Sequence, residues 1–362
     1  LMLDIWTEKR ENPAEWHEIA LKLIPKKGNL QLPQNWRPIC LIDVLLKVQN
    51  AIIAHRLDMH LASGIGIAEQ NGFTTGRGCT DGTAALKMAL QNLKDVGQDS
   101  YVVFIDLVKA FDSVNREMLW KLLPKFGVPR TLVAIIRRSY KNVYIQGCVN
   151  TEQFEFESLS GVKQGDPLSP VLFLFAMQAA LELAEKNWPA TIPTFEWFPQ
   201  SRKDGLPEGY LTQRIDSKSA ASLFEYYRSL FADDAAFMFQ SREDAKKGTQ
   251  HLINAFAAFG LEVHVGRRTA DGTAKESKTK YVHFPHDAAI EPDTTCLELA
   301  DGCHIAGDID FKYLGSIISA TLDDSIDIKL RISKGENAFN FMRPVLLNKK
   351  IPDHLRSYFF QS

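Results

Sequence analysis

Two adjacent aspartates lie between two short apolar runs, and this stretch constrains the fold more than any other. Asp233 and Asp234 follow residues 226–231 and precede residues 235–239. Alternating apolar and aromatic residues on both sides predict two strands, and the aspartate pair is predicted to form the tight turn between them. Aspartates are also common in surface turns. The apolar flanks favour a central sheet instead, where two carboxylates held so close together are unfavourable unless a cation lies beside them.

A third carboxylate, Asp106, closes the apolar run of residues 101–105. Such a run is typical of a buried strand, and a carboxylate at its end is costly unless it is paired or bound to a metal. A hydrogen-bonded structural aspartate is the alternative. A sheet that sets this strand beside the hairpin would gather the three carboxylates into a ligand set for two Mg²⁺ ions. Such ions can activate a 3′-hydroxyl and stabilise a leaving pyrophosphate, although spacing alone leaves other functions open.

Two glycine-containing loops are further candidates for contact with a nucleotide or nucleic acid. Residues 161–170 lead into a long apolar helix, which is expected to begin at Pro167 or Ser169 and to run to about residue 185. The N-terminus of a buried helix carries free N–H groups and partial positive charge, which suits a nucleotide or template strand; a plain helix start is the alternative. Residues 69–81 precede another helix, but they lack the Gly-Lys-Ser/Thr ending of a Walker phosphate loop.

Binding of nucleic acid would have to use local basic patches, because the formal net charge is −2. Lys26 lies in a basic turn, for which a solvated loop is the ordinary interpretation. Arg37 lies between Trp36 and Pro38. This position suits a phosphate clamp, and an arginine stacked on the tryptophan for structural reasons is the alternative.

The composition, 45% apolar and 24% charged, is that of an ordinary soluble globular protein. The five cysteines are scattered without a Cys-x-x-Cys pair, which favours a reducing, intracellular compartment and excludes a zinc knuckle in this segment. Residues 167–184 form the most apolar stretch, but Gln178 and Glu182 favour a buried helix over a membrane span. The first residues have no signal-peptide pattern. The chain opens without methionine, and we expect a segment of a longer polypeptide.

Periodicity predicts the remaining elements. Helices are expected at residues 43–62, 81–93, 114–125, 130–142, 242–259 and 324–347, with Asp112 and Ser113 as the N-cap of the third. Strands or hairpins are expected at residues 143–156, 261–265, 278–284 and 311–319. Residues 187–222 contain several prolines and glycines without periodicity, so we expect an irregular insertion.

In their order along the chain, these stretches resemble the motifs of the reverse transcriptase domain of non-LTR (LINE-type) retrotransposons, from about residue 20 to 345. Phe104-Ile105-Asp106-Leu107-Val108-Lys109-Ala110-Phe111-Asp112 resembles motif A, residues 161–170 resemble motif B, and Phe231-Ala232-Asp233-Asp234 resembles motif C. The other matches are residues 35–39, Gln70-Asn71-Gly72-Phe73 with Gly76-Arg77, Gly260-Leu261 with Lys278-Thr279, and Tyr313-Leu314-Gly315.

The resemblance implies an α+β right-hand polymerase, with an antiparallel palm sheet packed on helices. Fingers and palm would occupy residues 1–320, and residues 321–362 would begin the thumb. The implied activity is RNA-directed DNA synthesis, with an RNA template, a DNA primer, dNTPs and two Mg²⁺ ions, which Mn²⁺ could replace. The parent polyprotein would carry other domains such as an endonuclease. It would be translated in the cytoplasm and act in the nucleus, and no membrane is implied.

The resemblance also implies roles for individual residues. Asp106, Asp233 and Asp234 would be catalytic and would hold the metals together with the carbonyl of Leu107. Phe111, beside Ala110, would lie under the sugar of the nucleotide and crowd a 2′-hydroxyl. Further nucleotide contacts would come from Lys26 and Arg37 on the triphosphate, from Gln164 and Gly165, and from Lys278, a candidate for protonating pyrophosphate. Primer and template contacts would come from Gly76, Arg77, Tyr313, Leu314 and Gly315.

Two alternatives remain open at this level. A group II intron-type reverse transcriptase also carries an Asp-Asp motif, and flanking domains would separate it from the non-LTR branch. An inactive or domesticated RNA-binding module is the second alternative, although the three aspartates, Gln164 and Phe111 are all intact. Two features depart from the family pattern: the insertion at 187–222 is long, and residues 266–277 stretch the spacing before Lys278.

Overall fold

The computed structural model describes residues 2–7, 11–26, 28–149, 151–193, 196–197, 224–225, 227–268 and 274–361. Its helices are α1 (Met2–Trp6), η1 (Ala14–Trp16), η2 (Pro33–Asn35), α2 (Val44–His60), η3 (Leu61–Ile65), α3 (Cys79–Asp95), α4 (Ala110–Ser113), α5 (Arg116–Leu122), α6 (Arg130–Ser139), α7 (Ser169–Lys186), α8 (Arg242–Ala257), η4 (Ala300–Gly302), α9 (Ser325–Leu346) and α10 (Asp353–Gln361). Most of the predicted insertion at 187–222 lies outside the described residues.

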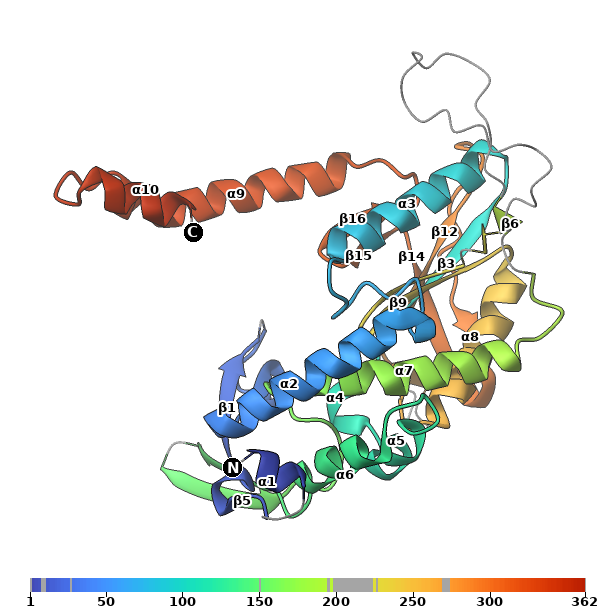
Figure 1. Cartoon of the computed structure of the whole chain (residues 1–362). Helices are drawn as coiled ribbons and strands as arrows, with labels where there is room; N and C mark the ends of the chain where they lie inside the picture. The colour runs from blue at the N-terminus through green and yellow to red at the C-terminus, as the bar shows by residue number, and fades with distance from the viewer. Residues whose placement is uncertain are drawn as a thin grey trace, which may run out of the picture.

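The strands form a large sheet, a smaller sheet and two separate two-stranded pairs (Figure 1). The large sheet has the order β11 (Ala274–Lys275), β10 (Gly266–Arg268), β14 (Cys303–Asp308), β12 (Lys280–Phe284), β3 (Ser100–Ile105), β9 (Asp234–Phe239), β8 (Arg228–Phe231), and β13 (Leu297–Glu298) pairs with β14. The smaller sheet has the order β2 (Trp36–Leu41), β1 (Glu18–Pro25), β4 (Tyr144–Val149), β5 (Glu152–Glu157). The pairs are β15 (Asp310–Tyr313) with β16 (Ser316–Ser319), and β6 (Glu196–Trp197) with β7 (Phe224–Glu225).

Strand β3 lies inside the large sheet and pairs antiparallel with both β9 and β12. Its side chains alternate between two apolar layers. Val103 and Ile105 belong to the core formed with α7 and α8. Val102 and Phe104 belong to the core formed with α3 and the β15–β16 hairpin, where Phe104 stacks on Phe311 with ring centroids 4.2 Å apart. Both faces of β3 are therefore covered, which explains its continuous apolar sequence.

Helix α7 confirms the buried helix predicted from the most apolar stretch. Thirteen of its residues are buried, among them Phe173 and Phe175. Gln178 is also buried, and its amide oxygen accepts the Ile67 N–H at 3.0 Å. Within the described part of the chain, no helix is long and apolar enough to cross a membrane.

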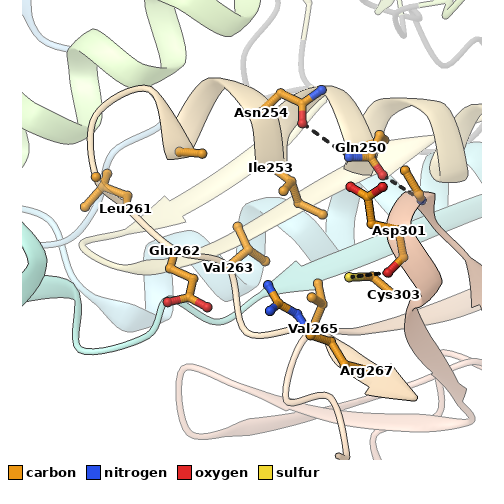
Figure 2. A pocket seen from close by; sticks show the side chains of 13 residues that line it. Gln250, Ile253, Asn254, Leu261, Glu262, Val263, Val265, Arg267, Asp301 and Cys303 are labelled. Carbon is orange, nitrogen blue, oxygen red and sulfur yellow. Dashed lines mark hydrogen bonds between the residues drawn. The ribbon is translucent and has the colours of Figure 1, made fainter. Parts of the chain in front are cut away.

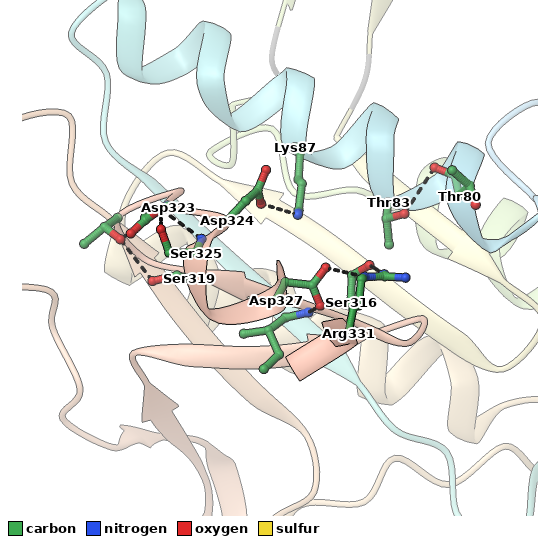
Figure 3. A network of polar contacts seen from close by, with 12 residues as sticks. Thr80, Thr83, Lys87, Ser316, Ser319, Asp323, Asp324, Ser325, Asp327 and Arg331 are labelled. Carbon is green, nitrogen blue, oxygen red and sulfur yellow. Dashed lines mark hydrogen bonds and ion pairs between the residues drawn. The ribbon is translucent and has the colours of Figure 1, made fainter. Parts of the chain in front are cut away.

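The first turns of helix α9 are fixed to the β15–β16 pair and to α3, and the helix then extends away from the large sheet with α10 (Figure 1). Asp327 accepts the backbone N–H of Ile317 at 3.0 Å and the Nε–H of Arg331 at 2.9 Å (Figure 3). Burial alone would raise the pKa of Asp327, but these two donors hold that pKa below its ordinary value. Lys87 of α3 adds an ion pair to Asp324 at 2.5 Å. The base of α9 thus has a defined attachment.

The structure corrects two local predictions. The helix expected at 114–125 begins at Arg116, and its N-cap is Asn115, whose side chain accepts the Met118 N–H at 3.0 Å. Val114 is extended (ψ 123°), so Asp112 and Ser113 end the short helix α4 instead. Residues 261–265 form no regular strand, because their strand pairing is limited to one bridge between Val263 and Leu107, just after the end of β3.

Candidate active site

The predicted hairpin is present, but its turn lies one residue earlier than expected. Phe231 pairs with Asp234, so the two turn residues are Ala232 and Asp233, and Asp234 is the first residue of β9. Ala232 adopts the left-handed conformation with φ 56°. Because side chains alternate along a strand, Asp234 shares a face with Ala236, which lies in the core layer beneath α3.

The register brings Asp106 beside the hairpin turn. Ile105 lies opposite Ala235 in the antiparallel β3–β9 pair. The next residue of β3 therefore lies opposite the preceding residue of β9, which sets Asp106 across from Asp234. Asp106 and Asp234 lie on the same face of the sheet, and Asp233 is the adjacent residue in the turn. The expectation that one sheet sets these two chain segments side by side is confirmed.

The pKa values of Asp233 and Asp234 are both raised. Burial raises the pKa of Asp233; the negative charge of Asp106 also raises it, while the Asp233 N–H and the Arg37 guanidinium oppose the rise. Asp234 is exposed, but partial loss of hydration and the charges of Asp233 and Asp106 raise its pKa to about 6. Charge effects of this kind are expected where carboxylates lie near one another.

The backbone around Leu107 is oriented by the segment that follows α8. His264 donates its N–H to the Asp106 carbonyl at 2.8 Å, and Val108 donates to the Glu262 carbonyl at 2.8 Å. Since successive carbonyls point to opposite sides of an extended chain, the Leu107 carbonyl points away from this segment, toward the side of β9. This is the side on which the hairpin turn lies.

The chemistry of these donors fits a hard divalent cation, since they are carboxylate and carbonyl oxygens. In the structure, however, these oxygens are not gathered around one point. Within the described residues, no three His, Cys, Asp or Glu side chains converge closely enough to hold a metal ion. The structure thus brings the three backbone positions together, although their side chains do not converge.

Phe111 is fixed in orientation by two other rings. It stacks on Phe173 of α7 with centroids 5.0 Å apart and planes 11° apart. The ring of Phe73 meets it edge-on at 6.1 Å. Ala110, at the start of α4, is buried beside it. Phe173 therefore supports one face of the Phe111 ring, and the contact with Phe73 further limits the movement of that ring.

The loop of Gln164 and Gly165 is held next to Phe111. Val162 donates its N–H to the Phe111 carbonyl at 2.7 Å, and the Gln164 side chain donates to Asp112 at 3.2 Å. Gly165 has φ 108°, and a Cβ atom there would lie 2.7 Å from the Cys40 carbonyl oxygen. Only glycine fits this position, because both the backbone conformation and the space exclude a side chain.

The predicted cationic residues lie at different distances from the carboxylates. Arg37 is exposed on β2, and its positive charge opposes the rise in the pKa of Asp233. Lys26 is exposed at the end of β1 and acts in the same direction on Asp112. Lys278 is exposed, and its backbone N–H donates to His264 Nδ1 at 3.2 Å. Only Arg37 is thus linked electrostatically to the aspartate cluster.

The residues predicted to contact primer or template divide into buried and exposed positions. Tyr313 is buried, and its hydroxyl donates to the Ser229 carbonyl at 2.9 Å, so its side chain supports the hairpin strand β8. Leu314 and Gly315 form the turn that follows it, with φ 48° and 88°. Arg77 is exposed, but its guanidinium donates to the carbonyls of Ala68 and Gln70. Gly76 has open space around it.

Two features of the site region had no clear signal in the sequence. The Gln70 side chain contacts the turn at Ala232, although 162 residues separate the two. A cavity of about 560 Å³ also lies between α8 and the segment after it (Figure 2). Val263 and Val265, which sequence periodicity placed in a strand, line one wall of this cavity, and Gln250 and Asn254 line the other.

Comparisons with known proteins identify the family to which the chain is similar. The family model described as Reverse transcriptase (RNA-dependent DNA polymerase) matches residues 24–316. The Pol polyprotein of the R2 element of Nasonia vitripennis is 28% identical over 327 residues, which is 89% of this chain and 28% of that protein. The Pol polyprotein of element R2DM of Drosophila melanogaster is 32% identical over 170 residues, which is 46% of this chain and 16% of that protein. The chain thus spans 28% and 16% of these two relatives.

The fold is similar to that of a solved telomerase. The apo telomerase of Candida tropicalis aligns with a TM-score of 0.53 at 13% identity, over 87% of this chain and 49% of that one. At this identity the likeness concerns the fold: a mixed α/β arrangement rich in antiparallel strands. The family match and the R2 relatives lead to one conclusion. The chain belongs to the reverse transcriptase family and is a domain of the non-LTR retrotransposon type.

Proposed function

We propose that this domain is an RNA-directed DNA polymerase that copies retrotransposon RNA into cDNA, using a DNA primer and dNTPs. The observation that carries the proposal is the β3–β9 register, which sets Asp106 opposite Asp234 and next to Asp233. The charge of Arg37 acts on Asp233, and Phe111 contacts Phe73, whose neighbour Gly72 packs against the Ala232 backbone. The relatives are R2-type elements, which favours the non-LTR branch over a group II intron-type enzyme.

Asp106, Asp233 and Asp234, with the Leu107 carbonyl, are the residues that would hold two Mg²⁺ ions, or Mn²⁺ in their place. Bound there, the ions would supply activation of the primer 3′-hydroxyl and charge stabilisation of the leaving pyrophosphate. The donor set supports this assignment, because like-charged carboxylates with a raised pKa gain most from a neighbouring cation. Binding would require their oxygens to converge.

The remaining site residues would select and orient the nucleotide. Arg37 and Lys26 would contact the triphosphate through charge-assisted hydrogen bonds, and exposed Lys278 would donate a proton to pyrophosphate. The rigidly supported ring of Phe111 would crowd a 2′-hydroxyl and so favour dNTPs. Gln164 and Gly165, fixed beside that ring, would border the nucleotide and the template base.

A right-hand division of the chain accounts for the arrangement of the elements. Residues 1–320 would form fingers and palm, with the large sheet as the palm. Residues 321–362 would begin the thumb, where basic residues of α9 would follow the duplex backbone. The turn at Leu314 and Gly315 would contact the primer, and Gly76 with Arg77 the template. An endonuclease elsewhere in the parent polyprotein, and action in the nucleus, complete the proposal.

Primer extension on poly(rA)/oligo(dT) with dTTP and Mg²⁺ tests the proposed function. The wild type is expected to extend the primer, and Asp233→Asn is expected to lose extension while it still binds the RNA. Extension by Asp233→Asn at the wild-type rate would overturn the role of the carboxylates. Absence of extension by a folded wild type that binds RNA would instead support the inactive, RNA-binding alternative.

A further inference from the structure

The turn that presents Asp233 depends on an acceptor from a distant loop. Ala232 adopts φ 56°, a conformation that residues other than glycine rarely adopt. Its backbone N–H donates to the side-chain oxygen Oε1 of Gln70 at 2.8 Å, and the same oxygen accepts the Gly72 N–H at 2.8 Å. Gln70 is only 8% exposed. One buried amide oxygen thus joins the turn at Ala232 and Asp233 to the loop of residues 69–73.

Backbone pairing holds this loop against the hairpin. Strand β8 is the last strand on its side of the large sheet. Residues 69–71 lie along it: Asn71 donates its N–H to the Leu230 carbonyl at 2.8 Å, and Leu230 donates to the Glu69 carbonyl at 3.3 Å. Gln70 and Leu230 form a parallel bridge. The loop therefore covers the outer edge of β8 immediately before the turn.

Side chains and close packing fix the same contact. The buried guanidinium of Arg228 on β8 forms an ion pair with Glu69 at 3.5 Å. Gly72 approaches so closely that a Cβ atom there would lie 2.2 Å from the Ala232 nitrogen. The next residue, Phe73, places its ring against Phe111. One loop thus reaches both the aspartate turn and the ring predicted to select the sugar.

We propose that Gln70 is a positioning residue for the polymerase reaction: its amide oxygen fixes the left-handed turn at Ala232 and thereby the place of Asp233. The proposal rests on the proposed function for its catalytic consequence. Its structural part stands separately, because the acceptor role can be measured without activity. Loss of the acceptor leaves two buried N–H groups without a partner, which favours a rearranged turn.

Three variants test the proposal. Gln70→Met keeps the length of the side chain and removes the strong acceptor, and Gln70→Glu keeps an oxygen acceptor whether it is ionised or neutral. Gln178→Met is the matched control, because Gln178 is equally buried at 8% exposure. Its side chain also accepts a backbone N–H from the segment between η3 and α3, but that N–H belongs to Ile67 and not to the turn. Two readouts are taken: hydrogen exchange of peptides that cover residues 228–237, and kcat and KM for dTTP on poly(rA)/oligo(dT).

Gln70→Met is expected to speed exchange at the turn and to lower kcat about 100-fold, as for a misplacement of about 1 Å, with a much smaller change in KM. Gln70→Glu should restore slow exchange and most of kcat, and Gln178→Met should change neither at the turn. Unchanged exchange at the turn in Gln70→Met, or a wild-type kcat, would overturn the proposal. If the wild type itself makes no DNA, the proposed function fails, while the exchange comparison still decides the role of Gln70.

Discussion

The substitution Gly72→Ala should displace Asp233 and lower the reaction rate strongly, while it lowers the stability of the fold only modestly. A Cβ atom at this position would lie 2.2 Å from the Ala232 nitrogen and 2.6 Å from the Phe231 carbonyl carbon, both backbone atoms that no rotamer change can move. Ordinary contact begins at about 3.4 Å, so the loop and the turn must separate by about 1.2 Å, a displacement that typically costs about 100-fold in rate. Overpacking of this kind costs about 1–3 kcal/mol of stability.

The assay is single-nucleotide incorporation together with thermal unfolding. Gly97→Ala is the control, because Gly97 has φ 76° and open space around it, so alanine there strains the backbone without a clash. Its stability loss of about 1 kcal/mol should leave kcat unchanged. A Gly72→Ala protein that is folded and retains more than about half of the wild-type kcat would refute the argument that this contact places the turn.

Four further outcomes are expected. Phe111→Ala should lower discrimination against rNTPs by about tenfold or more in the ratio of kcat/KM values, since the ring supported by Phe173 no longer crowds the 2′-hydroxyl; unchanged selectivity would remove Phe111 from that role. Because the pKa of Asp234 is raised to about 6, activity should fall as the pH drops through that value, and a higher Mg²⁺ concentration should move the midpoint to lower pH; a midpoint independent of Mg²⁺ would contradict this. The raised pKa also means that ionisation of Asp234 destabilises the metal-free fold above its ordinary pKa, so Asp234→Asn should raise Tm at about pH 8 in EDTA but not at about pH 4. Asp327→Ala should lower the free energy of unfolding by about 1–3 kcal/mol, since the Ile317 N–H and Arg331 lose their acceptor at the base of α9. The DNA products should also be shorter, and products of wild-type length would show that the attachment of α9 does not affect processivity.

The sequence was sufficient where local pattern and burial coincide. The run that ends at Asp106 is apolar because both faces of β3 are covered, and α7 is apolar because it lies in the core. Asparagine and aspartate both cap helices, so composition alone could not choose Asn115 over Asp112; the extended Val114 between them makes the choice.

Features that depend on distant contacts were not predictable from the sequence. Nothing in Phe231-Ala232-Asp233-Asp234 indicates that alanine takes the left-handed position, for which aspartate is better suited. The acceptor on Gln70 stabilises that choice from a loop far away in the chain. The burial of Tyr313 has a similar origin, since its hydroxyl partner is Ser229, 84 residues earlier.

The central claim is that Asp106, Asp233 and Asp234 jointly hold the metals, and counting bound Mn²⁺ tests it most directly. Electron paramagnetic resonance titration would use a complex with poly(rA), a dideoxy-terminated primer and dTTP. The wild type should bind about two ions tightly per chain, and Asp106→Asn and Asp233→Asn should each lose at least one. Asp99→Asn, at the other end of β3, should lose none, because Asp99 instead accepts the His286 N–H at 2.8 Å. Equal Mn²⁺ binding by all four proteins would contradict the account.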